Sequence, residues 1–212
     1  MSSASDTVHS LASRVERSWQ ILLVSGSLRA GSTNTALLQT ARAVAPGGVT
    51  TVLYGGMAGL PHFNPDDDSE GEPVHAAVAG LRAQITTADA LLFCTPEYAG
   101  ALPGALKNLL EWTVGDAGTY GKPVAWINAS GPAAPTGAAD AHASLRKVMG
   151  YVGADIVEPA CVRIPVARAA VDADGTIGDP TIRGQVADTL TTLSRHVAHR
   201  EVEGPDEQPL SR

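Results

Sequence analysis

The sequence predicts an α/β domain built on an open, doubly wound parallel sheet with helices on both faces. Strand-like and helix-like patterns alternate along the chain between residues 19 and 200. Several of the strand-like runs are continuously apolar, as expected of strands that are buried on both faces. A chain of 212 residues is also long enough to bury a large core in one domain without a disulfide or a metal ion.

Five segments have the composition of strands. The first contains the unbroken apolar run Ile21–Val24, and the third contains the run Leu91–Cys94. The predicted strands are Trp19–Ser25, Val49–Tyr54, Ala90–Thr95, Val124–Ala129 and Ile156–Arg163.

Segments with helical periodicity lie between the predicted strands and after the last of them. Leu37, Leu38 and Ala41 share one face of the first helix, and Leu190 and Leu193 belong to an apolar stripe on the last. The predicted helices are Thr33–Val44, Pro73–Thr87, Pro103–Thr113, Ala138–Val152 and Thr181–His199.

Right-handed crossovers, with a reversal of direction after the second strand, give the strand order 2-1-3-4-5. In such a sheet, ligands bind at the carboxyl ends of the strands beside the switch point, between the first and third strands. The loops that follow Ser25, Thr95 and Ala129 are therefore the candidates for a binding site.

Charge and cysteine content narrow the class of protein. The formal net charge is -7, with 15 basic and 22 acidic residues and no basic cluster, which argues against nucleic acid and anionic membranes as partners. Two cysteines, Cys94 and Cys161, give no disulfide framework, and no secretory or membrane-spanning run is found. We therefore expect a cytoplasmic protein with a polar leader (1–18), one domain (19–200) and a flexible C-terminal tail (201–212).

The loop after the first strand has the composition of a phosphate site. Its glycine and hydroxyl residues lead from a strand into a helix N-terminus, where free backbone N–H groups and the helix dipole favour an anion. The candidate ligands are the hydroxyls of Ser27, Ser32 and Thr33, the amide of Asn34 and the guanidinium of Arg29. Neither a dinucleotide fingerprint nor an NTP-binding loop is present, so one phosphate monoester is the simplest guest. The alternative is an ordinary turn, with Ser32 or Thr33 capping the helix and Arg29 in solvent.

The loops after the third and fourth strands are expected at the same edge. Pro96 and Pro103 fix the first of them, and Tyr98 would lie at the mouth of the crevice, where its ring can stack on a flat heterocycle. The alternative for Tyr98 is an ordinary surface tyrosine. The loop Asn128–Pro132 is short, polar and glycine-bearing, and would add donors on the same rim.

Other motifs suggest no catalytic triad and no metal site. The run Asp172–Gly175 fails the calcium-loop template and indicates a turn. His196 and His199 lie one helical turn apart with no third ligand, which indicates a solvent-facing surface. Cys94 lies within an apolar strand and is expected in the core.

Two separated motifs carry a resemblance to a known family. The chain reads Gly26-Ser27-Leu28-Arg29-x-x-Ser32-x-Asn34, and later Pro96-Glu97-Tyr98-x-x-x-x-Pro103-Gly104-x-Leu106-Lys107-Asn108. In these motifs it resembles the NADPH-dependent FMN reductases, a family that includes quinone, chromate and azo-dye reductases and arsenical-resistance flavoproteins. The resemblance extends from about Trp19 to His199 and includes Leu60-Pro61-x-Phe63-Asn64-x-Asp66 and Asp174-Gly175-x-Ile177.

The resemblance implies a flavodoxin-like fold that binds FMN without a covalent bond, in a homodimer or homotetramer. The residues that it assigns to the FMN phosphate are Ser27, Arg29, Ser32 and Asn34, with Thr33 in the same loop. Pro96, Glu97, Tyr98 and Ala99 would line the isoalloxazine, mainly through backbone groups, and Ser130 and Gly131 would close the third side. Relatives often have Asn in place of Ala99 and a hydroxyl residue in place of Ala101, so this chain has fewer polar groups near the flavin edge.

The function implied is an FMN-dependent oxidoreductase. It would pass hydride from NADPH or NADH to bound FMN and then reduce a small-molecule acceptor, which could be a flavin, a quinone, an azo compound or a metal oxyanion. No side chain is assigned as a catalyst. One alternative is a flavodoxin-type electron carrier, which the acidic charge suits but the phosphate loop does not. A second is a binding module without cofactor, against which Arg29 and Tyr98 argue.

Overall fold

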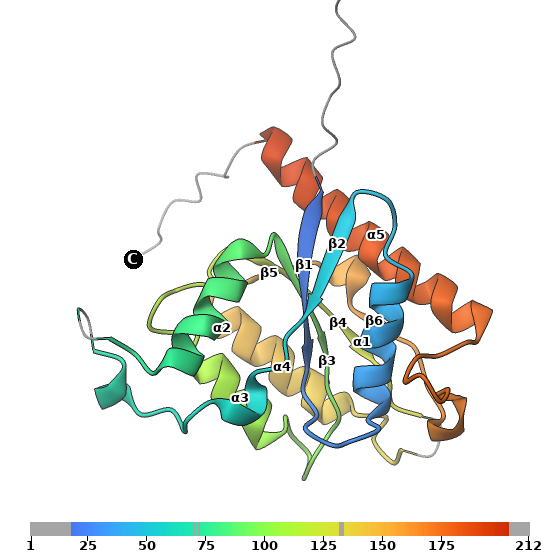
Figure 1. Cartoon of the computed structure of the whole chain (residues 1–212), viewed down its shortest axis with the longest axis horizontal. Coiled ribbons are helices and arrows are strands. Elements are labelled where there is room, and N and C mark those ends of the chain that lie inside the picture. The colour runs from blue at the N-terminus through green and yellow to red at the C-terminus, as the bar shows by residue number, and fades with distance from the viewer. Residues whose placement is uncertain (1–17, 70, 72, 132–133, 204–212) are drawn as a thin grey trace, which may run out of the picture.

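A computed structural model describes residues 18–69, 71, 73–131 and 134–203 (Figure 1). The sheet has the strand order β2-β1-β3-β4-β5, and a further strand, β6, pairs with β4. All neighbouring strands are parallel, which confirms the predicted fold class and strand order. The strands are β1 (Trp19–Ser25), β2 (Val49–Leu53), β3 (Ala90–Cys94), β4 (Pro123–Asn128), β5 (Asp155–Ile156) and β6 (Val162–Arg163).

The helices cover both faces of this sheet (Figure 1). On one face α1 and α5 pack together, and their apolar residues, among them Leu37 and Leu190, form one core cluster with the sheet. On the other face α2, α3 and α4 contribute Leu81, Leu106 and Leu145 to a second cluster. Because both faces are covered, each residue of β3 is buried, which explains its uniformly apolar sequence. The helices are α1 (Thr33–Ala43), α2 (Ala76–Thr87), α3 (Gly104–Glu111), α4 (Ala139–Tyr151) and α5 (Pro180–Glu203).

The prediction of one continuous fifth strand over Ile156–Arg163 was wrong. The segment forms β5, a 3₁₀ turn at Glu158–Ala160, and β6, and both short strands pair with β4. Pro159 lies inside the turn and has no N–H with which to continue a strand ladder. The chain therefore turns through the bond from the Ala160 N–H to the Val157 carbonyl (2.9 Å) before it rejoins the sheet.

The other predicted elements are found with ends shifted by up to four residues. The helix predicted from Pro73 begins at Ala76, where the His75 side chain accepts a hydrogen bond from the Ala77 N–H (3.2 Å). At the C-terminal end, α5 continues past His199 to Glu203. The rest of the predicted tail, and residues 1–17 of the predicted leader, lie outside the described residues. Within the described part of the chain, no helix is long and apolar enough to span a membrane.

The long connection after β2 is attached to α3 by one amide side chain. Asn108 accepts a hydrogen bond from the Phe63 N–H (2.7 Å) and donates one to the Pro61 carbonyl (2.9 Å). The indole N–H of Trp112 donates to the same carbonyl (2.9 Å), and its ring meets Phe63 edge to face at 5.0 Å. Asn108, which ends the second sequence motif, therefore fixes a loop of the scaffold.

Candidate functional site

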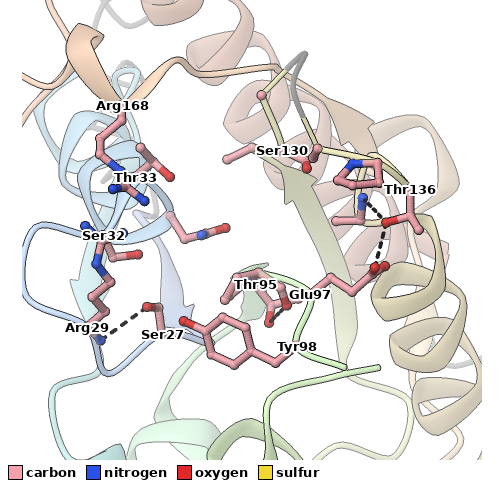
Figure 2. A pocket seen from close by; sticks show the side chains of 17 residues that line it. Ser27, Arg29, Ser32, Thr33, Thr95, Glu97, Tyr98, Ser130, Thr136 and Arg168 are labelled. Atoms are coloured by element: carbon pink, nitrogen blue, oxygen red, sulfur yellow. Dashed lines mark hydrogen bonds between the residues drawn. The ribbon is translucent and has the colours of Figure 1, made fainter. Parts of the chain in front are cut away.

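A cavity of about 300 Å³ opens at the carboxyl ends of β1, β3 and β4, where the topology predicts a ligand site (Figure 2). Each of the three predicted loops contributes to its wall. The lining residues are Ser27, Arg29, Ser32, Thr33 and Asn34; Thr95, Pro96, Glu97 and Tyr98; Ala129, Ser130, Gly131, Ala134, Pro135, Thr136 and Ala138; and Arg168.

The structure brings together all of the predicted site residues except Ala99, which lies on an exposed turn beside the cavity. Thr95 and Ala129, the ends of two predicted strands, also line the cavity. The remaining lining residues were not predicted, because they belong to no stretch with a recognisable motif: Ala134, Pro135, Thr136, Ala138 and Arg168.

The N-terminus of α1 is open towards a ligand. Ser32 occupies the N-cap position, but its side chain makes no capping hydrogen bond, and the first turn contains no acidic residue. The first N–H groups of a helix have no partner within the helix, so here they and the positive end of the dipole are left for an anion. Ser32 therefore takes the N-cap position and Arg29 is exposed, as the alternative expects, but the Ser32 hydroxyl does not satisfy the N–H groups of the first turn.

Hydrogen bonds within the loop arrange its donors. The Arg29 N–H donates to the Ser27 hydroxyl (3.3 Å), which keeps its own O–H as a donor towards the cavity. The hydroxyls of Ser25 and Thr35 bond to each other across the loop (2.8 Å). Gly26 is required by close approach, since a Cβ there would lie 2.2 Å from the Thr95 hydroxyl oxygen. The loops that follow β1 and β3 are thus held against each other at the base of the cavity.

The side-chain amide of Asn34 is oriented by a hydrogen bond from Cys94, a core residue. The Cys94 thiol donates to the Asn34 side-chain oxygen (3.3 Å), and burial raises the pKa of Cys94, so the group stays a thiol donor. This confirms Cys94 as a core residue. With its oxygen engaged, the Asn34 amide has its N–H groups left to donate to a guest in the cavity.

Tyr98 lies at the mouth of the cavity, as predicted, with 49% of its surface exposed. It begins a tight turn in which Tyr98 and Ala101 exchange two backbone hydrogen bonds of 3.1 Å. The two residues between them, Ala99 and Gly100, both have left-handed backbone angles (φ 52° and 71°). This is the geometry of a type I′ turn, which normally contains Asn or Gly at both positions.

Glu97 contributes its side chain to the scaffold. Its carboxylate accepts a hydrogen bond from the Thr136 hydroxyl (2.6 Å; Figure 2). It also accepts hydrogen bonds from the N–H groups of Asp140 (3.0 Å) and Ala141 (3.2 Å). It caps α4, whose own N-cap residue, Ala138, has no side-chain donor or acceptor. The Thr136 hydroxyl, together with these two N–H groups, lowers the pKa of Glu97. Of the two described helices that begin at this cavity, α4 is capped by Glu97, whereas α1 has no side-chain cap.

His142, on α4, is partly buried, and both of its ring nitrogens are shielded from solvent. Neither ring nitrogen of His142 has a hydrogen-bond partner within the described residues, and its ring lies 6.5 Å from that of Trp126. Burial lowers the pKa of His142 to about 4, although the nearby Glu97 carboxylate opposes this shift. The imidazole is therefore neutral at pH 7.

Arg168 reaches the cavity from the chain that follows β6. The Ile164 N–H donates to the Asn128 carbonyl (2.9 Å) and the Val166 N–H to the Ala129 carbonyl (3.2 Å), so this chain follows the end of β4. A 3₁₀ turn then begins at Arg168. Figure 2 shows its side chain beside Thr33, on the same side of the cavity as Ser32 and Arg29 and opposite Glu97 and Thr136.

The other motifs have structural roles. Asp172–Gly175 forms the predicted turn, closed by the Gly175 N–H on the Asp172 carbonyl (3.0 Å). His196 bonds to Asp155 (2.6 Å), so it is part of the contact between α5 and β5 rather than an open surface. No group of three or more potential metal ligands is found in the part of the chain that the structure describes.

Comparisons with known proteins identify the family. The model of the NADPH-dependent FMN reductase family matches residues 19–168. An NAD(P)H-dependent FMN reductase of Pseudomonas aeruginosa is 37% identical over 176 residues, which cover 82% of this chain and 92% of that protein. A 2-hydroxy-1,4-benzoquinone reductase of a Burkholderia species is 32% identical over 186 residues, which cover 86% and 98% of the two chains.

Solved structures show the same fold. The flavoenzyme NAD(P)H:(acceptor) oxidoreductase of Paracoccus denitrificans superposes with a TM-score of 0.70 at 29% identity, covering 84% of this chain and 98% of that one. A flavodoxin of Pseudomonas aeruginosa, 17% identical, superposes with a TM-score of 0.53 and covers 82% of this chain and 99% of its own. The flavodoxin-like fold is thus confirmed. By sequence and fold, the chain belongs to the NADPH-dependent FMN reductase family of oxidoreductases.

Proposed function

We propose that this protein is an FMN-dependent NAD(P)H oxidoreductase that reduces a small-molecule acceptor: a flavin, a quinone, an azo compound or a metal oxyanion. One observation carries the proposal. The open N-terminus of α1, with Arg29, and the exposed ring of Tyr98 line the same cavity, which suits a guest with one phosphate and one flat ring.

The donor set fits FMN. The N–H groups of α1, the hydroxyl of Ser27, the amide of Asn34 and the guanidinium of Arg29 would hold the phosphate. The backbone of Pro96–Tyr98 and the ring of Tyr98 would orient the isoalloxazine, and Ser130 and Gly131 would close the third side. Bound FMN would supply the hydride-accepting chemistry. The protein's own contribution is to bind, to orient and to keep water from one face of the ring, so we assign no side chain as general acid or base.

The relatives make a quinone the first acceptor to test, because one relative is named a 2-hydroxy-1,4-benzoquinone reductase. Either NADPH or NADH could serve as donor, since the Pseudomonas relative is named for NAD(P)H. The oligomeric state, a homodimer or homotetramer, stays a prediction that sedimentation velocity of the purified protein tests. The cytoplasmic location stays a prediction as well.

Spectroscopy and turnover test the proposal directly. The protein should bind FMN and be yellow, and NADPH or NADH should bleach it under anaerobic conditions. Addition of a quinone should restore the colour, with steady oxidation of the donor when all components are present. Binding of FMN without donor oxidation would favour the flavodoxin-type carrier, and failure to bind FMN would refute the assignment.

The role of Tyr98 has a test of its own. Replacement Tyr98→Ala removes the ring and should weaken FMN binding by about two- to tenfold, the range expected for one aromatic contact. Replacement Tyr98→Phe keeps the ring and serves as the matched control, with affinity close to that of the unmodified protein. Equal affinities for the two variants in a fluorescence titration would show that the ring does not contact the flavin.

A further inference from the structure

We propose that Arg168 is a second guanidinium ligand for the phosphate, and that it selects a flavin with a terminal phosphate, FMN, over riboflavin and FAD. This inference rests on the proposed function, because it concerns the same cavity. It adds a residue that lies outside both sequence motifs and a selectivity that those motifs do not specify.

The backbone holds Arg168 at this end of the cavity. The segment before it is attached to the end of β4 by the bonds from the N–H groups of Ile164 and Val166. Gly131 allows the close approach of that segment, since a Cβ at Gly131 would lie 3.2 Å from the Val166 carbonyl oxygen. From there the side chain reaches the α1 side of the cavity, beside Thr33, where Figure 2 also shows Arg29.

Charge balance indicates what this end of the cavity binds. Neither Arg29 nor Arg168 has a carboxylate partner within the described ranges, whereas Arg82, Arg146 and Arg200 are each paired with an acid. The carboxylate that lines the cavity, Glu97, lies on the opposite side and is committed to α4. Two guanidinium groups and the open N-terminus of α1 therefore lie on one side of the cavity, and no acidic residue among those described lines that side.

A phosphate monoester neutralises this arrangement best. It carries a charge of about -1.5 to -2 at pH 7 and has three terminal oxygens, enough for two guanidinium groups and the helix N–H groups. Riboflavin has no phosphate. The phosphates of FAD are linked to each other and carry one charge each, so neither offers a terminal dianion. FMN alone among these three flavins matches two arginines.

Affinity ratios test the inference without relying on turnover. Flavin-free protein is titrated with FMN, riboflavin and FAD, and binding is followed by flavin fluorescence. Replacement Arg168→Ala should weaken FMN binding by about ten- to a hundredfold, the scale of a hydrogen bond to a charged group, and leave riboflavin binding unchanged. Replacement Arg168→Lys should recover part of the loss. The control Arg195→Ala removes an equal charge from an exposed position on α5 and should change neither affinity.

The possible outcomes separate this inference from the proposed function. If the unmodified protein binds no flavin, the proposed function fails and the inference fails with it. If it binds FMN, and Arg168→Ala keeps the same ratio of FMN to riboflavin affinity, the role of Arg168 is refuted while the function stands. A rise in the KM for NADPH but not for NADH, with FMN affinity unchanged, would also overturn the inference, because it would assign Arg168 to the donor.

Discussion

The turn that carries Tyr98 should be stabilised by one substitution, Ala99→Asn. Ala99 has a φ of 52° and is followed by Gly100 with a φ of 71°. An L-residue other than Gly or Asn is strained in this left-handed region, whereas Asn-Gly is the preferred pair for a type I′ turn. Ala99 is exposed, so a larger side chain has room.

The magnitude follows from the backbone conformation. A left-handed L-residue costs roughly 1–2 kcal/mol, and Asn avoids part of that cost. We therefore expect Ala99→Asn to raise the free energy of unfolding by about 0.5–1 kcal/mol, which corresponds to about 1–4 °C in Tm for a chain of this size. Replacement Ala99→Val should act in the opposite direction, because a β-branched residue is disfavoured at positive φ.

Urea unfolding of the flavin-free protein measures these differences without a contribution from bound cofactor. Ala101→Asn is the matched control: Ala101 is the exposed last residue of the same turn and is not left-handed, so its change should stay within about 0.5 kcal/mol. If Ala99→Asn gains no more stability than Ala101→Asn, or if Ala99→Val is as stable as the unmodified protein, Ala99 is not strained.

Two further predictions concern the scaffold around the site. Asn108→Ala leaves the Phe63 N–H without an acceptor and removes one of the two donors to the Pro61 carbonyl. It should lower the free energy of unfolding, measured in urea, by about 2–4 kcal/mol. Lys107→Ala, which removes only an exposed ion pair with Glu111, should cost less than about 1 kcal/mol, and an equal loss would contradict the role of Asn108. Because the pKa of the partly buried His142 is about 4 against an ordinary 6.5, the unfolded chain takes up a proton between these pH values that the native chain does not. Stability should therefore fall from pH 7 to pH 5, and His142→Phe should remove about 2 kcal/mol of that fall; parallel pH profiles of the two proteins would contradict this.

The sequence predicted the sheet because its central strands are buried on both faces and therefore read as unbroken apolar runs. Strand order followed from handedness and the position of the switch point, which depend on general geometry rather than on particular side chains. The fifth strand was the exception. Pro159 interrupts the ladder, and an apolar run by itself does not show where a strand leaves and rejoins its neighbour.

Site residues could be predicted only where they lie close together in the sequence. The phosphate loop and the Tyr98 loop each occupy one short stretch, so their residue types are visible together. Glu97 is different, because its carboxylate caps a helix more than 40 residues further along the chain. Arg168 is a second such case, since it reaches the cavity only because β6 pairs with β4. Contacts of this kind depend on the assembled fold.

Because the cavity forms only in the folded protein, binding of the cofactor should also stabilise the protein against unfolding. Arg29, Glu97, Thr136 and Arg168 come from four distant segments, and they meet only when the sheet is complete. A partly folded chain has no such cavity, so a flavin that fits it binds the native state alone. At a hundred times its Kd, a ligand of this kind adds about 2.7 kcal/mol to the free energy of unfolding. Flavin supply in the cell would then regulate how much of this protein survives proteolysis, before any electron is transferred.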